Sequence, residues 1–305
     1  MTVTETVQNP QAREPVKVKR RIAAAWWFVL PAFAVYAAFV LLPMAISVYY
    51  SLLNWDGIGQ ARFAGLSNYW EVMTDSDLLQ IIGNAFQLII YFTAVPVVLG
   101  LLIASVIRNQ MSGRFGTVTR TILFIPQVIP LVAAGIAWSW MYDFDGVVNQ
   151  FLALIGLDDW MRGWLGDFDY ALPAVGLIGT WVLLGLCLLL LVTGIAKIDP
   201  ALYEAAKLDG ATPWQEFRHV TLPSLRPEIG VCITVTIIQA LSSFDVVYVS
   251  TGGGPGIETT VPGLEIYRLA FAHREVGLAS ALGVVLMVLV LICILPVQWL
   301  TREKS

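Results

Sequence analysis

Charged residues are scarce in this chain of 305 residues. Asp, Glu, Lys and Arg together make up 13% of it, whereas a soluble domain carries roughly 25%, and hydrophobic residues make up 57%. The mean hydropathy is +0.74. This balance excludes an ordinary soluble domain and indicates an integral membrane protein, so the sequence has to be divided into spans before it is divided into domains.

Histidine and cysteine are also scarce, and each scarcity excludes a kind of site. The two histidines, His219 and His273, are predicted to lie on opposite sides of the membrane, so they cannot form a two-histidine metal site or a histidine-centred triad. The three cysteines fall inside apolar runs without a paired spacing, which favours packing thiols over a disulfide or a metal site: Cys187, Cys232 and Cys293. We expect no catalytic residue and no metal bound by this chain.

A nucleotide-binding loop is missing as well. The glycine-rich segment TGGGPG at 251–256 lacks the Gly-Lys-Ser/Thr ending with which a P-loop reaches phosphate and magnesium. We expect it to form a turn at the outer end of a span. The chain is therefore expected to bind no cofactor, and the energy for any transport must come from a partner or from an ion gradient.

Six apolar runs of about 20 residues are long enough to cross a membrane as helices. They do not alternate between apolar and polar residues, as LLGLCLLLLV at 183–192 illustrates, and this excludes the strands of a membrane barrel. The sequence therefore predicts an all-α membrane protein with six spans, near 25–50, 82–107, 122–141, 172–196, 229–250 and 278–300. The first span is too long for a signal-peptide core and is interpreted as an uncleaved anchor.

Lysine and arginine are distributed unequally between the two sides of this predicted topology. The N-terminal tail, the second loop, the fourth loop and the C-terminus hold fourteen of the eighteen basic residues, and the remaining loops hold Arg62, Arg162, Arg268 and Arg274. By the positive-inside rule, both termini and the fourth loop are cytoplasmic. The predicted domains are a flexible cytoplasmic tail at 1–24, a transmembrane domain at 25–300 and a cytoplasmic C-terminal tail at 301–305.

The fourth loop, 197–227, is charged and contains helix signals. Asp199 and Pro200 form an N-cap and N1 pair, so a short helix should run to about Leu208, where Asp209 and Gly210 end it. Thr212 and Gln215 form a capping box around Pro213 at the start of a second short helix. Its apolar face is predicted to carry Trp214, Phe217 and Val220, and its end is predicted at Leu222 and Pro223.

Such a two-helix element permits two interpretations from its residues alone. The first is an interfacial helix that lies on lipid, with Glu204 and Lys207 paired on its wet face. The second is a docking element for a cytoplasmic protein. An interfacial helix is usually richer in Lys and Arg on its polar face, but the periodicity does not separate the two.

Three stretches resemble membrane subunits of ATP-binding-cassette (ABC) importers. EAAKLDGATPWQEFRHVTLPSLRP at 204–227 resembles their EAA loop, and the preceding KIDPALY narrows the resemblance to the carbohydrate-uptake group, the maltose and glycerol-phosphate type permeases. LFIPQVIPLVAAGIAWSWMYDFDGVVN at 123–149 and FDVVYVSTGGGPGIETTVPGLEIYRLAF at 244–271 resemble the third and fifth spans of that group with their outer loops. The resemblance implies the type I importer permease (MetI-like) fold.

The resemblance also implies partners and a coupling role. In this group a second homologous permease completes the pathway, two ATPase subunits hydrolyse ATP with Mg, and an extracytoplasmic solute-binding protein delivers the solute in a bacterial or archaeal cytoplasmic membrane. The chain itself is then a non-catalytic subunit with no nucleic-acid partner. The residues that would meet the ATPase are Glu204, Ala205, Ala206, Asp209, Gly210, Trp214, Phe217, Leu222 and Pro223, of which the last two tie the element to the fifth span.

Polar residues in the fourth and fifth spans are candidates for the solute path, because a polar side chain tends to face a bundle interior or a wet cavity rather than lipid. They are Thr180, Trp181, Thr236, Gln239, Ser243 and Asp245, with Trp138 and Ser242 nearby. Tryptophan could stack on a sugar ring, and Gln239 and Ser243 are four residues apart on one expected helix. The competing interpretation is that Ser and Thr pack helices together and that Trp anchors the chain at the interface.

Two functions are thus open at the level of sequence. The first is a permease subunit that imports a sugar or a related solute. The alternative is a stand-alone ion-driven secondary transporter, which would predict internal repeats, ionisable residues near the middle of the membrane and no docking element. The spans carry almost no charge, and the docking element is present. The absence of Lys and Arg from the spans favours a neutral cargo.

Overall fold

The structure is a computed structural model that describes residues 19–108 and 114–301, and the chain divides into two units, Met1–Ile46 and Ser47–Ser305. The tail predicted at 1–24 lies mostly outside the described residues, and the C-terminal tail lies outside them beyond Thr301.

The first unit is one long helical stretch. It consists of α1 (Lys19–Tyr36), the π-helical turn η1 (Ala37–Leu41) and the first part of α2 (Leu42–Tyr50), and Pro31 lies inside α1. Side chains between Trp27 and Ile46 are exposed or partly exposed, as expected for a span whose apolar surface is covered by lipid or by another subunit. Trp27–Tyr50 is long and apolar enough to cross a membrane.

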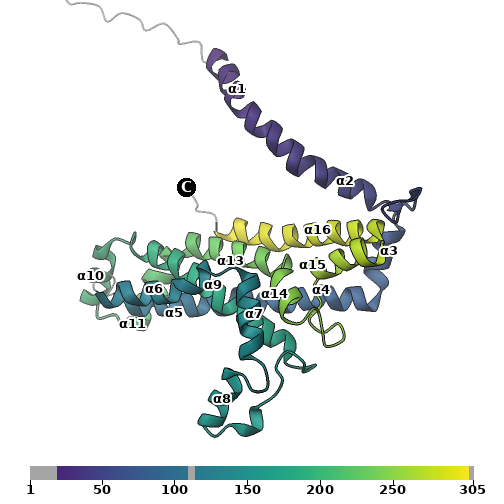
Figure 1. The fold of residues 1–305 in the computed structure, drawn as a ribbon. Coiled ribbons are helices and arrows are strands. Elements are labelled where there is room, and N and C mark those ends of the chain that lie inside the picture. Colours follow the sequence, from purple (N-terminus) through teal and green to yellow (C-terminus); the bar gives the residue numbers. More distant parts are fainter. Residues whose placement is uncertain (1–18, 109–113, 302–305) are drawn as a thin grey trace, which may run out of the picture. The chain divides into compact units, whose positions relative to one another are not determined.

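The second unit is a helical bundle (Figure 1). Its first half contains β1 (Leu53–Asn54), β2 (Arg62–Phe63), α3 (Ser67–Thr74), α4 (Ser76–Ile89), η2 (Ile90–Ala94), α5 (Val95–Ile107), α6 (Arg114–Val128), α7 (Leu131–Met141), α8 (Val147–Leu154) and η4 (Asp158–Trp160). Its second half contains α9 (Ala171–Ile195), α10 (Pro200–Leu208), α11 (Pro213–Glu216), η5 (Phe217–Thr221), α12 (Leu222–Ser224), α13 (Arg226–Leu241), α14 (Asp245–Ser250), α15 (Pro262–Tyr267), η6 (Arg268–His273) and α16 (Val276–Thr301).

Helix α9 is the centre of the bundle. It packs against α5 and α6, and most of it is buried. Glycines allow this close packing: a Cβ on Gly179 would overlap the ring of Phe92, and one on Gly185 would lie 2.6 Å from the carbonyl oxygen of Leu123. Small residues that bring helices together are typical of membrane bundles, where apolar side chains gain little by leaving lipid.

The predicted all-α membrane fold is confirmed, with one short antiparallel strand pair added. Four helical stretches of the described residues can cross a membrane on length and composition, and up to six can if each of two bent helix pairs is one span. The predicted third span is broken: α6 and α7 meet at 104° because Pro130 cannot continue the helix. The bent pair at the fifth span joins Pro213–Ser224 to Arg226–Leu241 at 69°.

The fifth span also ends earlier than predicted. Helix α13 stops at Leu241, and α14 begins only at Asp245, so 229–250 is not one continuous helix. The interruption is where α15 comes close: a Cβ on Gly263 would lie 2.8 Å from the carbonyl oxygen of Ser243. Phe244 accordingly leaves the helical region, with φ −141° and ψ −56°.

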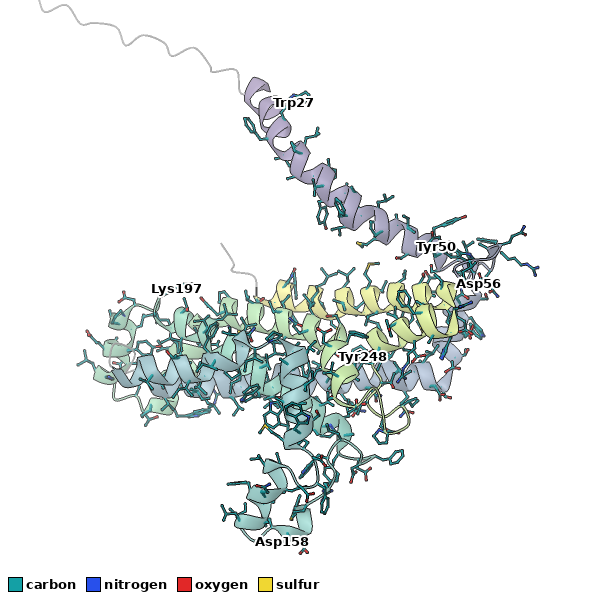
Figure 2. The ribbon with its side chains drawn as sticks, viewed as in Figure 1. Trp27, Tyr50, Asp56, Asp158, Lys197 and Tyr248 are labelled. Atoms are coloured by element: carbon teal, nitrogen blue, oxygen red, sulfur yellow. The ribbon has the colours of Figure 1, made fainter. Side chains whose placement is uncertain are left out.

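One end of the bundle, which we call the α10 end, brings together elements that are far apart in the sequence. At the α10 end, Lys197 at the end of α9 approaches Glu228 at the start of α13, and Gly230 lies against Thr301 at the end of α16. Lys197 is labelled at this end in Figure 2. The end of α5 also lies here. The structure therefore brings the end of α5, the segment after α9 and the end of α16 to one end of the bundle.

Candidate functional site

The predicted first short helix is confirmed as α10. The Asp199 carboxylate accepts a hydrogen bond from the backbone N–H of Ala201 at 2.9 Å and caps its start. At its end, Gly210 N–H donates to Lys207 O at 3.0 Å and Ala211 N–H donates to Ala206 O at 2.9 Å, which is a Schellman motif. Gly210 has φ +75°, the left-handed conformation that this motif needs, so glycine is the residue that allows the chain to turn here.

The second short helix has the predicted capping box. The Thr212 N–H donates to Gln215 Oε1 at 2.7 Å, and the Gln215 N–H donates to Thr212 Oγ1 at 3.4 Å. The predicted end at Leu222 and Pro223 agrees with the structure to within one residue, because the helical backbone runs from Pro213 to Ser224. A π-helical turn, in which Leu222 N–H donates to Phe217 O, precedes Pro223, and this wider turn accommodates the proline.

The residues predicted to meet a partner are mostly on the surface of this chain. Glu204, Ala205, Asp209, Trp214, Leu222 and Pro223 are exposed, Gly210 is exposed at the turn, and Ala206 and Phe217 are partly buried. Trp214 is 63% exposed and stacks on Phe217, with the ring centroids 5.4 Å apart. Leu208 is 89% exposed. The lipid-surface interpretation expected an ion pair between Glu204 and Lys207. Within the described residues, the two side chains form no such pair.

A partly buried ion pair that the sequence did not predict holds this element to α5. Arg108 Nη2 lies 2.7 Å from Glu216 Oε2, and its guanidinium lies 3.9 Å from the ring centroid of Tyr203. The Tyr203 hydroxyl lies 3.1 Å from Thr221 Oγ1. Burial lowers the pKa of the Arg108 guanidinium, but hydrogen bonds to Glu216 and Tyr203 outweigh burial, and the net effect raises the pKa. Arg108 and Glu216 are far apart in the sequence, so no spacing could reveal the pair.

An apolar groove adjoins this ion pair. It is about 380 Å³ in volume and lies between the end of α5 and the second short helix, with walls that include Leu102, Val106, Pro213, Trp214 and Phe217. The exposed face of α10, the Trp214–Phe217 stack and this groove form one surface at the α10 end. We call residues 197–227 the coupling segment.

The candidate solute-path residues lie in different surroundings. Thr180 Oγ1 donates to Tyr91 O at 2.6 Å and Thr236 Oγ1 donates to Cys232 O at 2.8 Å, so both hydroxyls are satisfied by backbone inside the bundle. This geometry supports helix packing for these two threonines. Trp181 is partly buried and meets Trp138 edge to face, with the ring centroids 5.7 Å apart.

The remaining three candidates lie around the break after α13. Gln239 is exposed on α13, whereas Ser243 is buried beyond the end of that helix, so the two do not share one helix face. The Ser243 hydroxyl has no hydrogen-bond partner among the described residues. Asp245 is exposed at the first turn of α14. Ser242 is exposed and donates its hydroxyl to Ile238 O.

An aromatic cluster next to this break was not among the predicted site residues. Phe244, the residue before α14, and Tyr248 of α14 stack at 5.2 Å between ring centroids, and Tyr267 of α15 lies 5.7 Å and 5.9 Å from them. Tyr248 is labelled in Figure 2. Tyr248 and Tyr267 are each nearly half exposed. The signal in the sequence was the i, i+4 spacing of Phe244 and Tyr248, which faces both rings the same way.

The described residues hold no group of three or more His, Cys, Asp or Glu that could bind a metal ion. The three cysteines are free, and Cys187 and Cys232 are buried.

The sequence of the chain matches one family model and is similar to permease proteins of bacteria and archaea. Residues 96–303 match the model of the family described as binding-protein-dependent transport system inner membrane component. The chain is 33% identical over 266 residues to the probable ABC transporter permease protein YurN of Bacillus subtilis, covering 87% of this chain and 91% of that one. It is 32% identical over 281 residues to the trehalose/maltose transport system permease protein MalF of Thermococcus litoralis, covering 90% and 92%.

Solved structures agree with the fold. A bacterial alginate ABC transporter, crystallised in complex with an alginate pentasaccharide-bound periplasmic protein, contains a chain with a TM-score of 0.77 and 25% identity. The match covers 93% of this chain and 95% of that chain. The chain therefore has the fold of a chain in that transporter.

Proposed function

Because the chain belongs to the family of binding-protein-dependent transport system inner membrane components, we propose that it is one permease subunit of an ABC importer and forms half of a translocation pathway. The cargo we propose is a sugar or a related neutral solute. The printed functions of relatives support this choice, since one is a trehalose/maltose permease and another a diacetylchitobiose uptake permease.

The proposed importer contains further subunits. A second homologous permease completes the pathway, two ATPase subunits supply energy from ATP and Mg, and an extracytoplasmic binding protein delivers the solute. This chain is non-catalytic and binds no cofactor itself. It lies in the cytoplasmic membrane of a bacterium or archaeon, with the α10 end and both termini on the cytoplasmic side, because the basic loops gather there.

The coupling segment is the proposed contact with the ATPase. The observation that carries this proposal is a rigid backbone with exposed side chains. Both short helices are capped at their starts, whereas Glu204, Leu208 and Trp214 are exposed. Exposed aromatic and apolar side chains on a rigid element are typical of a contact with another protein. The Glu204 carboxylate makes no ion pair within residues 19–108 and 114–301, and such an exposed carboxylate can pair with a basic or amide group of another protein.

The proposed solute contacts lie between the coupling segment and the outer loops. We retain Trp181, Gln239, Ser243 and Asp245 as solute-path candidates and add the ring faces of Tyr248 and Tyr267, which can stack on a sugar. Thr180 and Thr236 are better explained as packing residues, because backbone carbonyls already accept their hydroxyl protons.

The test is reconstitution of the importer in proteoliposomes with and without its ATPase subunits. With ATP and the binding protein we expect uptake of maltose or trehalose, the sugars transported by the named relative. Uptake by this chain alone, driven by an ion gradient, would support a secondary transporter and contradict the proposal.

A second arm tests the coupling segment. Proline at position 210 cannot adopt φ +75°, and it removes the N–H that bonds to Lys207 O. The variant should therefore disrupt both the C-terminal end of α10 and the turn between the two short helices. We expect the variant to insert in the membrane but to lose both ATPase co-purification and uptake. Retention of both would show that the ATPase docks elsewhere. Gly163→Pro, in an open loop between α8 and α9, is the control.

A further inference from the structure

We propose that Arg108 is a positioning residue that links both short helices of the coupling segment to the second span, so that displacement of the segment moves the end of α5. The inference rests on the proposed coupling function of residues 197–227. Arg108 is the C-cap residue of α5, directly after a stretch that is long and apolar enough to be a span.

The first observation is the burial of a charge. Glu216 is 5% exposed and is the only Asp, Glu, Lys or Arg of the described residues with a buried side chain. A buried carboxylate is costly unless a cation compensates it, and removal of the partner leaves an uncompensated charge. Arg108 supplies that cation at 2.7 Å, so the position of α11 depends on the end of α5.

The second observation is that one guanidinium contacts both short helices. It pairs with Glu216 of α11 and lies over the ring of Tyr203 of α10, 3.9 Å from the ring centroid. Gly210, the turn between the two helices, lies between these contacts in the sequence and has no atom near its would-be Cβ. The Arg108 side chain therefore fixes the relative placement of α10 and α11 across a turn that packing does not support.

The third observation is that the linkage continues into the turn that leads to the fifth span. The Tyr203 hydroxyl and Thr221 Oγ1 are 3.1 Å apart, and Thr221 is 1% exposed in η5, just before α12 and α13. A force applied at the exposed face of α10 thus reaches two spans, α5 through Arg108 and α13 through Thr221. Such a linkage of packed and hydrogen-bonded side chains is the physical means by which coupling travels.

The chain offers a matched control pair at the same end. Lys197 and Glu228 lie 3.3 Å apart, but the lysine side chain is 70% exposed. This pair joins α9 to α13 and contacts neither short helix. An exposed pair is screened by water and contributes little, so its loss should leave coupling unchanged.

The experiment uses the importer assembled with its second permease, its ATPases and its binding protein, and ATP is the probe. The variants are Glu216→Gln, Arg108→Gln, Arg108→Lys and the exchanged pair Arg108→Glu with Glu216→Arg, with Glu228→Gln, outside the coupling segment, as control. Two quantities are measured: the stimulation of ATP hydrolysis by the binding protein, and hydrogen exchange at 95–108 and 200–224 with and without ATP plus vanadate.

We expect both Gln variants to retain their ATPase subunits and basal hydrolysis but to lose stimulation about tenfold, within the range that residues on a coupling network produce. Vanadate trapping should change exchange at 200–224 but no longer at 95–108. Arg108→Lys should show a smaller loss because it keeps the charge without the planar group over Tyr203. The exchanged pair should recover part of the stimulation, and Glu228→Gln should match the unsubstituted chain.

Normal stimulation and a normal exchange response at 95–108 in both Gln variants would overturn the inference. So would loss of the ATPase subunits from those variants, because the pair would then serve docking itself. Failure of this inference can be distinguished from failure of the proposed function. If Gly210→Pro retains coupling, the coupling segment is not the contact with the ATPase. If Gly210→Pro loses coupling but the Arg108 and Glu216 variants retain it, the segment is the contact and only its link to α5 is wrong.

Discussion

The two connections at the ends of α9 differ in how they are held. The α8 lobe, residues 142–170, precedes α9, and the coupling segment, residues 197–227, follows it. Figure 1 shows α8 projecting from the bundle. Both connections contain a short helix that ends on a left-handed glycine, Gly156 at φ +76° and Gly210 at φ +75°. They nevertheless use different interactions beyond that glycine.

The α8 lobe is locked by a buried amide that bonds to backbone. Asn149 is fully buried; its Nδ2 donates to Phe144 O at 3.0 Å and to Arg162 O at 2.8 Å, and its Oδ1 accepts from Trp164 Nε1 at 2.9 Å. Asp158, labelled at the tip of the lobe in Figure 2, is one of its six acids. The coupling segment is held instead by side chains that meet side chains, namely Arg108, Glu216 and Tyr203.

This contrast separates a rigid element from one that can move as a body. Backbone bonds to one central amide fix the lobe internally, so it keeps its shape. The coupling segment has rigid pieces, but few contacts join α10 to the bundle other than the Arg108 cluster. We infer that the lobe presents a fixed surface, while the coupling segment transmits displacement.

Among substitutions that compare the two connections, Asn149→Ala should cause the largest change in hydrogen exchange. The change removes the partner of two backbone carbonyls and of the Trp164 N–H in a partly buried site, and each such group costs up to about 1–3 kcal/mol where water does not replace the partner. Hydrogen exchange at 143–164 should rise by more than tenfold, while exchange at 200–224 should stay the same. Gln150→Ala is the control, because Gln150 is exposed and donates only to Asp145 O at 2.8 Å. Unchanged exchange in Asn149→Ala would show that the lobe is not locked by this amide.

A smaller effect is expected from paired glycine substitutions. Neither Gly156 nor Gly210 has an atom within 4 Å of a would-be Cβ, so Gly→Ala at either site adds only backbone strain, of about 1–2 kcal/mol. Local exchange should therefore rise equally in α8 and α10. Only Gly210→Ala should lower the stimulation of ATP hydrolysis in the assembled importer. Equal loss of stimulation by Gly156→Ala would contradict the assignment of coupling to one end of α9.

The coupling segment was predictable because its signals are local. Asp199, Gly210 and the Thr212–Gln215 box each act within four residues, and the structure has all three as the sequence predicted. Apolar runs likewise predicted the spans, because length and hydropathy are properties of one segment. The second helix ends at Ser224, one residue beyond the prediction, and the π-helical turn inside it was not predicted, because proline on its own usually signals a stop.

Features that depend on tertiary contacts could not be predicted in the same way. The Arg108–Glu216 pair joins positions 108 residues apart, and nothing in either local sequence indicates the other. The break after Leu241 depends on the approach of α15 at Gly263, and two buried threonines that looked like cavity residues are instead bonded to backbone. A polar residue in a span can be satisfied by its own or a neighbouring helix, so polarity alone does not locate a solute path.

The smallest expected effect compares the helix cap of α11 with a turn that precedes α9. Thr212→Ala removes the capping box of α11, and loss of such a cap costs about 1 kcal/mol. Asp167→Ala removes the carboxylate that accepts from Asp169 N–H at 2.9 Å in the turn before α9. Each change should raise hydrogen exchange only at its own site. Stimulation of ATP hydrolysis should fall about two- to fivefold for Thr212→Ala, because a frayed α11 weakens the hold of Glu216 on Arg108. Asp167→Ala should leave stimulation unchanged, and a fall of the same size there would mean that both ends of α9 respond to the ATPase.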